Sequence, residues 1–260
     1  MTTKREHISY SELKDWAHCP HYHKKAWVEK VAPFEGNEYT AFGSAIHDVC
    51  EKKLLREDID EAEVFQIGFS QRLQELVEKN IEVNPQNIEQ MKEAGPKILA
   101  EVEEALKDYF GDYEVFSSEE MLYVPIENFN IFFKGFVDAV VKVGDTYHLF
   151  DWKTCSWGWD SRKKAEKLVT YQLTLYKHFF CLKHKIDPKK VETHFALLKR
   201  TAKKDRVEIF RVTSGPKKTE NALKLLYQAI YNITKKFTIK NRLHCHKPYP
   251  CKLLNTEHCR

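Results

Sequence analysis

The sequence has no apolar run near the roughly 18 residues that a membrane-spanning helix requires. Its first residues, Met-Thr-Thr-Lys-Arg-Glu-His, lack the apolar stretch that is typical of a secretory signal peptide. A Gly-x-x-x-x-Gly-Lys-Ser/Thr phosphate loop is also missing, which argues against a fused ATPase. We therefore expect a cytoplasmic protein with no membrane contact and no helicase motor.

A disulfide framework is not expected either. The chain has an odd number of cysteines and no secretion signal, whereas disulfide-stapled proteins are secreted and usually have an even number. Free thiols or metal ligation therefore remain open. The seven cysteines are Cys19, Cys50, Cys155, Cys181, Cys245, Cys251 and Cys259.

The 260 residues are 42% hydrophobic and 31% charged, an ordinary composition for a globular protein. The net charge of +4 hides an asymmetry. Residues 51–110 carry 15 acidic and 8 basic side chains, whereas residues 161–260 carry 25 basic and 7 acidic ones. A basic half favours a polyanionic partner, most simply nucleic acid, although a solvated lysine-rich surface would look the same.

The hydrophobic periodicity predicts helices first and a sheet afterwards. Ser9 and Glu12 form a capping-box pattern that opens the first helix, and Ser214 is placed to cap the last one. The short apolar strand ending at Trp152 is expected to be central. We predict helices at 9–31, from 39 onward, 59–80, 86–109, 161–184 and 216–237, and strands at 113–125, 129–143, 147–152, 191–199 and 206–212.

This order indicates an α/β fold with a central mixed sheet flanked by helices and a helical N-terminal part. We expect one domain over residues 1–260, made of a mainly helical part (1–111), a sheet core (112–240) and a cysteine-containing tail (241–260).

Asp138 and Asp151 are the residues most suggestive of chemistry. Two strands joined by a tight turn can bring these carboxylates together, and one or two carboxylates are the usual protein ligands of Mg²⁺. Lys153 leaves the same face of the strand as Asp151, because side chains two residues apart share a face. A lysine there can orient a water or stabilise charge on a phosphate. A single Asp-x-Lys at a strand end is more often merely solvated.

The order of the motifs resembles the PD-(D/E)XK nuclease superfamily, and in particular its RecB-like and AddB-like exonucleases and the CRISPR-adaptation nucleases. The resemblance covers nearly the whole chain. The matching motifs are Ile8-Ser9-Tyr10-Ser11-x-Leu13 through Cys19-Pro20, Gly43-Ser44-Ala45-Ile46-His47, Gly135-x-x-Asp138, Asp151-Trp152-Lys153-Thr154 and Gln172-x-x-x-Tyr176.

The resemblance implies a restriction-endonuclease-like core and a role for each matching residue. His47, Asp138, Asp151 and the backbone carbonyl of Trp152 would bind Mg²⁺ or Mn²⁺. Lys153 would be the catalytic lysine. Gln172 and Tyr176 would contact DNA or steady the catalytic strand, and either Glu119 or Glu120 would supply a further acidic residue.

The cysteines near the two ends carry a second resemblance. Some RecB-like nucleases place one cysteine before the core and three after it, as Cys19, Cys245, Cys251 and Cys259 stand here, and bind a [4Fe–4S] cluster with them. This chain departs from the commonest pattern, since its tail has no close Cys-x-x-Cys pair. A zinc site that uses His244, His246 or His258, and unliganded thiols, remain alternatives. Cys50, Cys155 and Cys181 are interpreted as packing residues.

The resemblance implies a Mg²⁺- or Mn²⁺-dependent deoxyribonuclease, an exonuclease acting on single- or double-stranded DNA ends in replication, recombination or repair. A stand-alone chain fits a phage or mobile-element enzyme, with replication or recombination proteins as partners. The alternatives are a CRISPR-adaptation nuclease and a nucleic-acid-binding protein that has lost catalysis. The full set of metal and lysine residues argues against the last of these.

Overall fold

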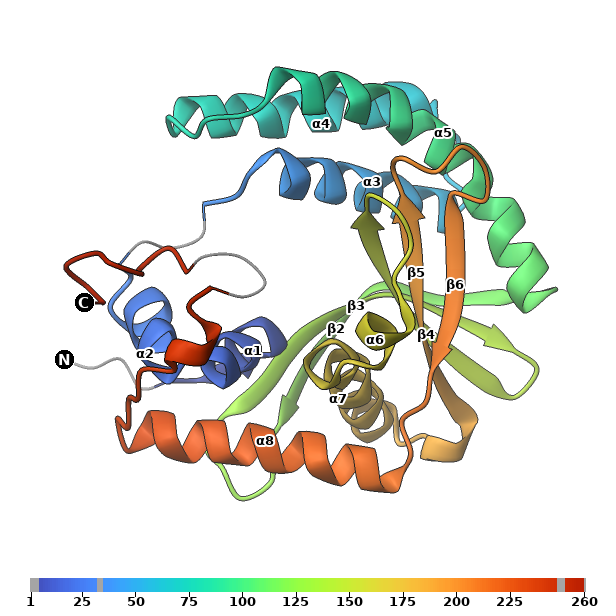
Figure 1. Cartoon of the computed structure of the whole chain (residues 1–260). Coiled ribbons are helices and arrows are strands. Elements are labelled where there is room, and N and C mark those ends of the chain that lie inside the picture. The colour runs from blue at the N-terminus through green and yellow to red at the C-terminus, as the bar shows by residue number, and fades with distance from the viewer. Residues whose placement is uncertain (1–4, 32–34, 247–250, 260) are drawn as a thin grey trace. The chain divides into compact units, whose positions relative to one another are not determined.

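The computed structural model describes residues 5–31, 35–246 and 251–259, and the chain forms two compact units. One, here called the sheet unit, comprises Glu35–Met121 and Phe136–Ser214. The other, here called the terminal unit, comprises Met1–Phe34, Leu122–Gly135 and Gly215–Arg260. Figure 1 shows the order of the helices and strands along the chain.

The sheet unit contains a mixed sheet. β3 (Phe132–Val143), β4 (Thr146–Cys155), β5 (Val191–Lys199) and β6 (Val207–Val212) are neighbours in that order, and β2 (Glu114–Pro125) also pairs with β3. β4 runs antiparallel to β3 and parallel to β5, while β5 and β6 are antiparallel. The predicted mixed sheet and the central position of the strand that contains Asp151 are therefore confirmed.

Helices cover both faces of this sheet. α3 (Glu38–Leu54), α4 (Glu61–Glu78) and α5 (Pro85–Phe110) share one apolar core with strand residues such as Phe150 and Trp152. α7 (Lys167–His184) packs Leu173 against Phe195 and Leu197, which point to the opposite face because side chains alternate along a strand. The α/β class and the flanking helices are confirmed (Figure 1).

The start of α3 is set by local sequence. Asn37 caps the helix: its side chain accepts a hydrogen bond from the Thr40 backbone N–H at 3.0 Å, and the Thr40 hydroxyl oxygen accepts one from the Asn37 backbone N–H at 2.9 Å. One turn later Gly43 lies against β4. A Cβ at Gly43 would be 3.2 Å from the Thr154 hydroxyl, so glycine permits the close approach of helix and strand.

The predicted first helix is interrupted. α1 (Tyr10–His18) ends at Cys19, which has extended backbone dihedrals, and α2 (Pro20–His23) and a π-helical turn (Lys24–Val28) follow. The cause is Pro20, whose ring disfavours helical geometry in the preceding residue. The predicted helix over 9–31 was therefore wrong as a continuous element.

Two other predicted boundaries differ from the structure. The helix expected at 161–184 divides at Glu166, which is extended, into α6 (Ser161–Ala165) and α7. The N-cap of α8 (Pro216–Thr234) is Gly215, not Ser214. The Ser214 hydroxyl instead lies 3.0 Å from the Thr174 hydroxyl and forms a hydrogen bond with it, which removes it from the helix end.

The terminal unit brings both chain ends together. β1 (His7–Ser9) pairs in parallel with the first residues of β3, and α1 packs on α8. Several hydrogen bonds attach the C-terminal segment to the first helices; among them, Asn241 Nδ2 donates to the His18 carbonyl at 2.9 Å, and the His21 ring bonds the His258 carbonyl at 2.8 Å. A short 3-10 turn, η3 (Arg242–His244), precedes Cys245.

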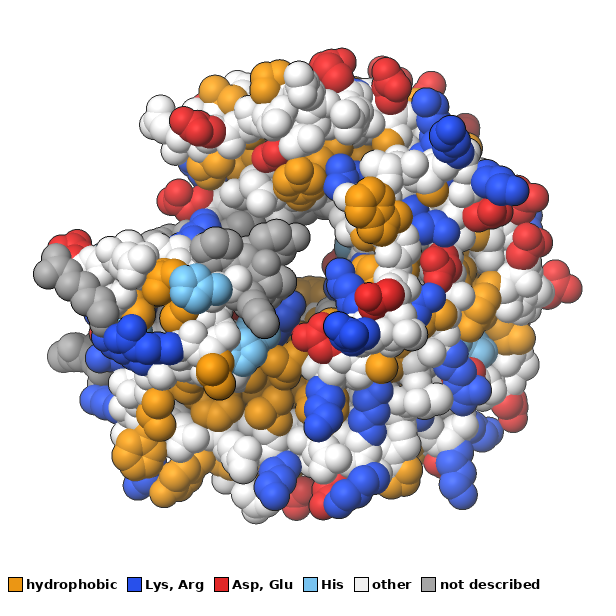
Figure 2. Space-filling view, in the orientation of Figure 1, with side chains coloured by type: hydrophobic (Ala, Val, Ile, Leu, Met, Phe, Trp, Pro, Cys, Tyr) orange, Lys and Arg blue, Asp and Glu red, His pale blue; other side chains and the backbone are white. Residues whose placement is uncertain are grey.

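The charge asymmetry of the sequence is visible on the surface. In Figure 2, Lys and Arg side chains are numerous over α8, while Asp and Glu side chains are visible over α4 and α5. Among the described residues, no helix is both long and apolar enough to cross a bilayer.

Gly95 in α5 provides a stability test. A Cβ built there would lie 2.3 Å from the ring of Phe65, which is itself fully buried. We expect Gly95→Ala to lower the free energy of unfolding by about 1–3 kcal/mol, the usual cost of overpacking, although alanine favours helix. Urea denaturation measures this, and Gly215→Ala serves as the contrast, because nothing lies within 4 Å of a Cβ there and its φ of −75° is accessible to alanine. Unchanged stability in Gly95→Ala would contradict the packing.

Candidate active site

Asp138 on β3 and Asp151 on β4 lie side by side in the sheet unit. Ala139 pairs with Phe150 in the antiparallel register, so the next positions along, Asp138 and Asp151, are opposite each other. The backbone N–H of Trp152 donates to Asp138 Oδ2 at 2.7 Å. Burial and the neighbouring Asp151 carboxylate raise the pKa of Asp138 well above its ordinary value.

His47 reaches the same place from α3. Its Nδ1 is 3.6 Å from Asp138 Oδ2, and its ring also hydrogen-bonds to the backbone of Trp152. Burial lowers the pKa of His47 to about 4. The imidazole is therefore neutral at physiological pH, which is the form that binds metal ions.

Lys153, Gln172 and Tyr176 complete the cluster. The Lys153 ammonium forms an ion pair with Asp151 Oδ2, and although burial lowers its pKa, the Asp151 and Asp138 carboxylates raise it above the ordinary value. Gln172 Nε2 donates to Asp151 Oδ1 at 2.6 Å and lies 3.4 Å from the Tyr176 hydroxyl. Burial raises the pKa of Tyr176, so its hydroxyl stays protonated.

The structure thus brings together every residue predicted for the nuclease site. For Trp152, only the backbone was predicted to take part. Its side chain lies in the core, and its backbone reaches the cluster. Gln172 and Tyr176 are one turn apart on α7, so their side chains share one helix face, and Gln172 reaches Asp151 on β4 from it.

The donor set fits a hard divalent cation. The buried Asp151 carboxylate and the largely buried Asp138 carboxylate face each other with a neutral imidazole beside them, and the Lys153 ammonium interacts with both carboxylates. Apart from that ion pair, Asp151 Oδ2 is buried and accepts no hydrogen bond from the described residues. Carboxylate oxygens with excess negative charge are the ligands that Mg²⁺ and Mn²⁺ prefer.

The two alternative acidic residues, Glu119 and Glu120, have different surroundings in the structure. Glu120 is neutralised by Lys183 at 2.6 Å and by His184 at 2.7 Å. Glu119 instead lies near the cluster: burial, together with Glu51, Asp48 and Asp151 nearby, raises its pKa. Of the two, Glu119 is exposed and is the one whose carboxylate lies within electrostatic range of Asp151.

A comparison with protein families shows what this arrangement belongs to. The model of the PD-(D/E)XK nuclease superfamily matches residues 7–255. The chain is a member of this superfamily. A search of curated proteins finds no significant match.

Two solved structures are similar to the chain. A crystal structure from Eubacterium rectale, of a protein provisionally named an exonuclease, has a TM-score of 0.59 at 14% identity and covers 96% of this chain and 91% of that one. The crystal structure of a protein named SSO0001 has a TM-score of 0.38 at 14% identity, covering 89% and 78%. The first supports the nuclease fold, and the second carries no argument.

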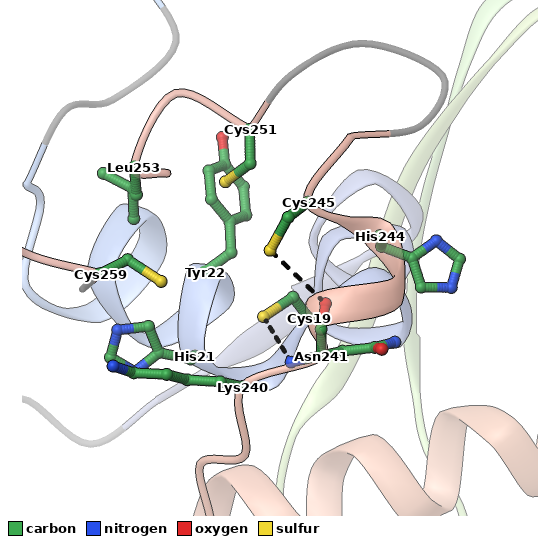
Figure 3. Close-up of a pocket in the computed structure, with 10 residues that line it drawn as sticks. All are labelled: Cys19, His21, Tyr22, Lys240, Asn241, His244, Cys245, Cys251, Leu253 and Cys259. Atoms are coloured by element: carbon green, nitrogen blue, oxygen red, sulfur yellow. Dashed lines mark hydrogen bonds between the residues drawn. The ribbon is translucent and has the colours of Figure 1, made fainter. Parts of the chain in front are cut away.

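The terminal unit of this superfamily member contains a separate cysteine cluster. Cys19, Cys245, Cys251 and Cys259 line one pocket together with residues such as His21 and Tyr22, and Figure 3 shows the four sulfur atoms around it. Burial and the three other thiols raise the pKa of Cys245. Four thiols from both ends of the chain are the donor set of a [4Fe–4S] cluster, so the residues fit that group.

The histidines fit a zinc alternative less well. His244 lines the pocket, but in Figure 3 its ring points away from the sulfur atoms. His246 is exposed and does not line the pocket, and His258 contributes its carbonyl to His21. Of the cysteines interpreted as packing residues, Cys50 and Cys181 are buried and Cys155 is partly buried.

Proposed function

We propose that the protein is a Mg²⁺- or Mn²⁺-dependent deoxyribonuclease that hydrolyses phosphodiester bonds with the His47, Asp138, Asp151 and Lys153 cluster. The observation that carries the proposal is the convergence of these side chains from α3, β3 and β4, in a chain of the PD-(D/E)XK nuclease superfamily. A DNA substrate is supported by the 25 basic against 7 acidic residues in 161–260.

Each residue has a defined task in this proposal. His47, Asp138, Asp151 and the Trp152 carbonyl would hold the metal ion, and Gln172 would keep Asp151 in place through its 2.6 Å hydrogen bond. When bound, Mg²⁺ supplies Lewis-acid chemistry, because it lowers the pKa of a water and neutralises charge on a phosphate. The Lys153 ammonium would stabilise the negative charge that develops on the phosphate oxygens.

Replacement of Lys153 tests this assignment. We expect Lys153→Ala to slow Mg²⁺-dependent degradation of end-labelled DNA by at least about 100-fold, because the donor that stabilises the transition state is lost. Lys142→Ala is the matched control, since its ammonium lies over the Tyr147 ring at 5.8 Å on the same sheet, outside the cluster. Undiminished cleavage by Lys153→Ala would overturn the mechanism.

We further propose that the enzyme acts on DNA ends, as an exonuclease in replication, recombination or repair. The family resemblance and the provisional name of the Eubacterium rectale protein support an exonuclease. Circular DNA distinguishes the two modes, because an exonuclease degrades the linear form and leaves the closed circle intact. Cleavage of both forms at equal rates would replace this proposal with an endonuclease.

The cysteine cluster is proposed to bind a [4Fe–4S] cluster that joins the two ends of the chain. Protein purified without oxygen is expected to be brown, with the broad absorption near ~400 nm of such clusters. Cys251→Ala should lose iron and absorption, whereas Cys155→Ala, a partly buried cysteine on β4, should retain both. Colourless, iron-free wild-type protein from iron-replete cells would contradict the cluster, and bound zinc would favour the alternative.

A further inference from the structure

Three polar side chains meet on the sheet at a place that the proposed nuclease site does not use. His148 lies on β4, and Glu192 and His194 lie two residues apart on the neighbouring β5. The parallel register pairs His148 with Glu192 and Phe150 with His194. Since side chains alternate along a strand, all three point to the same face, the one covered by α5.

The donor atoms of these residues are close together. His148 Nδ1 is 3.1 Å from His194 Nε2, and Glu192 Oε2 is 3.8 Å from the first nitrogen and 4.0 Å from the second. Ligand atoms of a tetrahedral zinc ion are about 3.3 Å apart, given metal–ligand bonds of about 2.0–2.1 Å. The two nitrogens already have this separation, and the carboxylate needs to move by about half an ångström.

A second contact orients His194. Its Nδ1 is 3.3 Å from the hydroxyl of Tyr109, which comes from the last turn of α5. When Nδ1–H donates to this hydroxyl, the lone pair of Nε2 is free and points toward His148 and Glu192. Metal-binding histidines usually have such a partner on the other ring nitrogen.

The surroundings suit a bound ion of moderate affinity. His194 is buried, Phe110 packs on both histidine rings, and the partial exposure of His148 and Glu192 leaves a path for an ion to enter. Burial lowers the pKa of His194 to about 3, so this ring is neutral. The positive charge of Arg211 weakens cation binding, because its guanidinium is 2.8 Å from Glu192 Oε1. The other carboxylate oxygen, Oε2, still faces the histidines.

We propose that His148, Glu192 and His194 bind a divalent first-row transition ion of the zinc type, with a water in the fourth position. Two imidazoles and one carboxylate are ligands that such ions prefer over Mg²⁺. The ion would join β4 to β5. His148 and Asp151 are three residues apart on β4, about 10 Å, and they point to opposite faces of the sheet, so this site is separate from the nuclease cluster.

Metal counting tests the proposal without measuring nuclease activity. EDTA-treated full-length protein is dialysed against micromolar Zn²⁺, and bound zinc is counted for the wild type, His148→Ala and Glu192→Gln. We expect each variant to bind one zinc ion fewer than the wild type. His7→Ala, an exposed histidine outside the cluster, should bind as many as the wild type. The same one-ion difference is expected in an Asp138→Asn background, which weakens the nuclease cluster.

Equal zinc counts in the wild type and in a folded His148→Ala/Glu192→Gln double variant would overturn the proposal. The cluster would then be a hydrogen-bond network only. If the variants do not fold, anomalous diffraction from wild-type crystals soaked in Zn²⁺ tests the site instead. A peak between the three donors supports the site, and its absence at saturating zinc refutes it. Tyr109→Phe is expected to weaken zinc binding by about 10-fold, since it removes the outer partner of His194.

Discussion

Asp138→Asn is expected to make the metal-free protein more stable by about 1–3 kcal/mol, while abolishing Mg²⁺-dependent DNA cleavage. The Asp151 carboxylate is buried, the largely buried Asp138 carboxylate faces it, and Lys153 offsets one negative charge. Asparagine keeps an oxygen that can accept the Trp152 N–H bond of 2.7 Å and removes the second charge. Chemical denaturation in EDTA, alongside the cleavage assay, measures both effects.

The pH dependence of this effect has a definite sign. Burial and Asp151 raise the pKa of Asp138 in the folded state, while in the unfolded chain an aspartate has a pKa of about 3.9. A carboxyl group with a raised folded-state pKa favours folding at low pH, and this contribution is lost as the pH rises through that pKa. The stability gain of Asp138→Asn over the wild type should therefore grow from about pH 4 upward, in EDTA.

Asp145→Asn is the matched control, because Asp145 is an exposed aspartate in the same β3–β4 hairpin, 3.2 Å from Lys190. It should change stability little at any pH. Addition of Mg²⁺ should stabilise the wild type, because a ligand that binds only the folded state raises the free energy of unfolding. Asp138→Asn should be nearly unaffected. A loss of stability in metal-free Asp138→Asn would show that the two carboxylates do not repel each other.

The nuclease cluster could be predicted because its geometry is mostly local. Asp151 and Lys153 share a face by strand periodicity, and a tight turn fixes the register that puts Asp138 opposite Asp151. Helix periodicity puts Gln172 and Tyr176 on one face of α7, but it does not show that this face meets the cluster. His47 likewise depends on how α3 packs on β4, and only the family resemblance pointed to these three residues.

Features that depend on neighbouring strands or unusual backbone could not be predicted. Glu119 and Glu120 were equal candidates because the sequence does not reveal the positive φ of 48° at Glu119, which disturbs the alternation of β2. His148 lies 44 or more residues before Glu192 and His194, and no pattern in the sequence shows that their strands pair in register. The Cys19-Pro20 step did carry a signal, since proline disfavours helix in the residue before it.

Glu12 shows how a correct local motif can hide a tertiary role. The Ser9 side chain caps α1 as predicted, accepting from the Glu12 N–H at 3.2 Å. The Glu12 carboxylate does not complete the capping box; it forms an ion pair with Arg5 and a 2.7 Å contact with the His23 ring. Glu12 and His23 are both buried, and they belong to α1 and α2, the two helices that Cys19 separates in the sequence. Their contact therefore joins the two helices where the helical backbone is interrupted.

We expect Glu12→Gln to lower the free energy of unfolding by about 3 kcal/mol, because removing one partner leaves Arg5 and a buried His23 uncompensated. Burial raises the pKa of Glu12, but the His23 and Arg5 hydrogen bonds outweigh it and hold the pKa below its ordinary value. This stabilisation is present above the unfolded-state pKa of about 4.3 and is lost as the pH falls through the folded-state value. The deficit of Glu12→Gln in urea denaturation should therefore be large at pH 7 and shrink in acid.

Glu6→Gln provides the comparison, since Glu6 is exposed and only six residues from Glu12. It should unfold like the wild type at both pH values. Because the Glu12–His23 bond holds α2 beside α1 next to Cys19, Glu12→Gln should also reduce the iron bound by anaerobically purified protein, whereas Glu6→Gln should not. A stability deficit of the same size at pH 7 and in acid would show that glutamine loses packing rather than charge, and would contradict the ion-pair explanation.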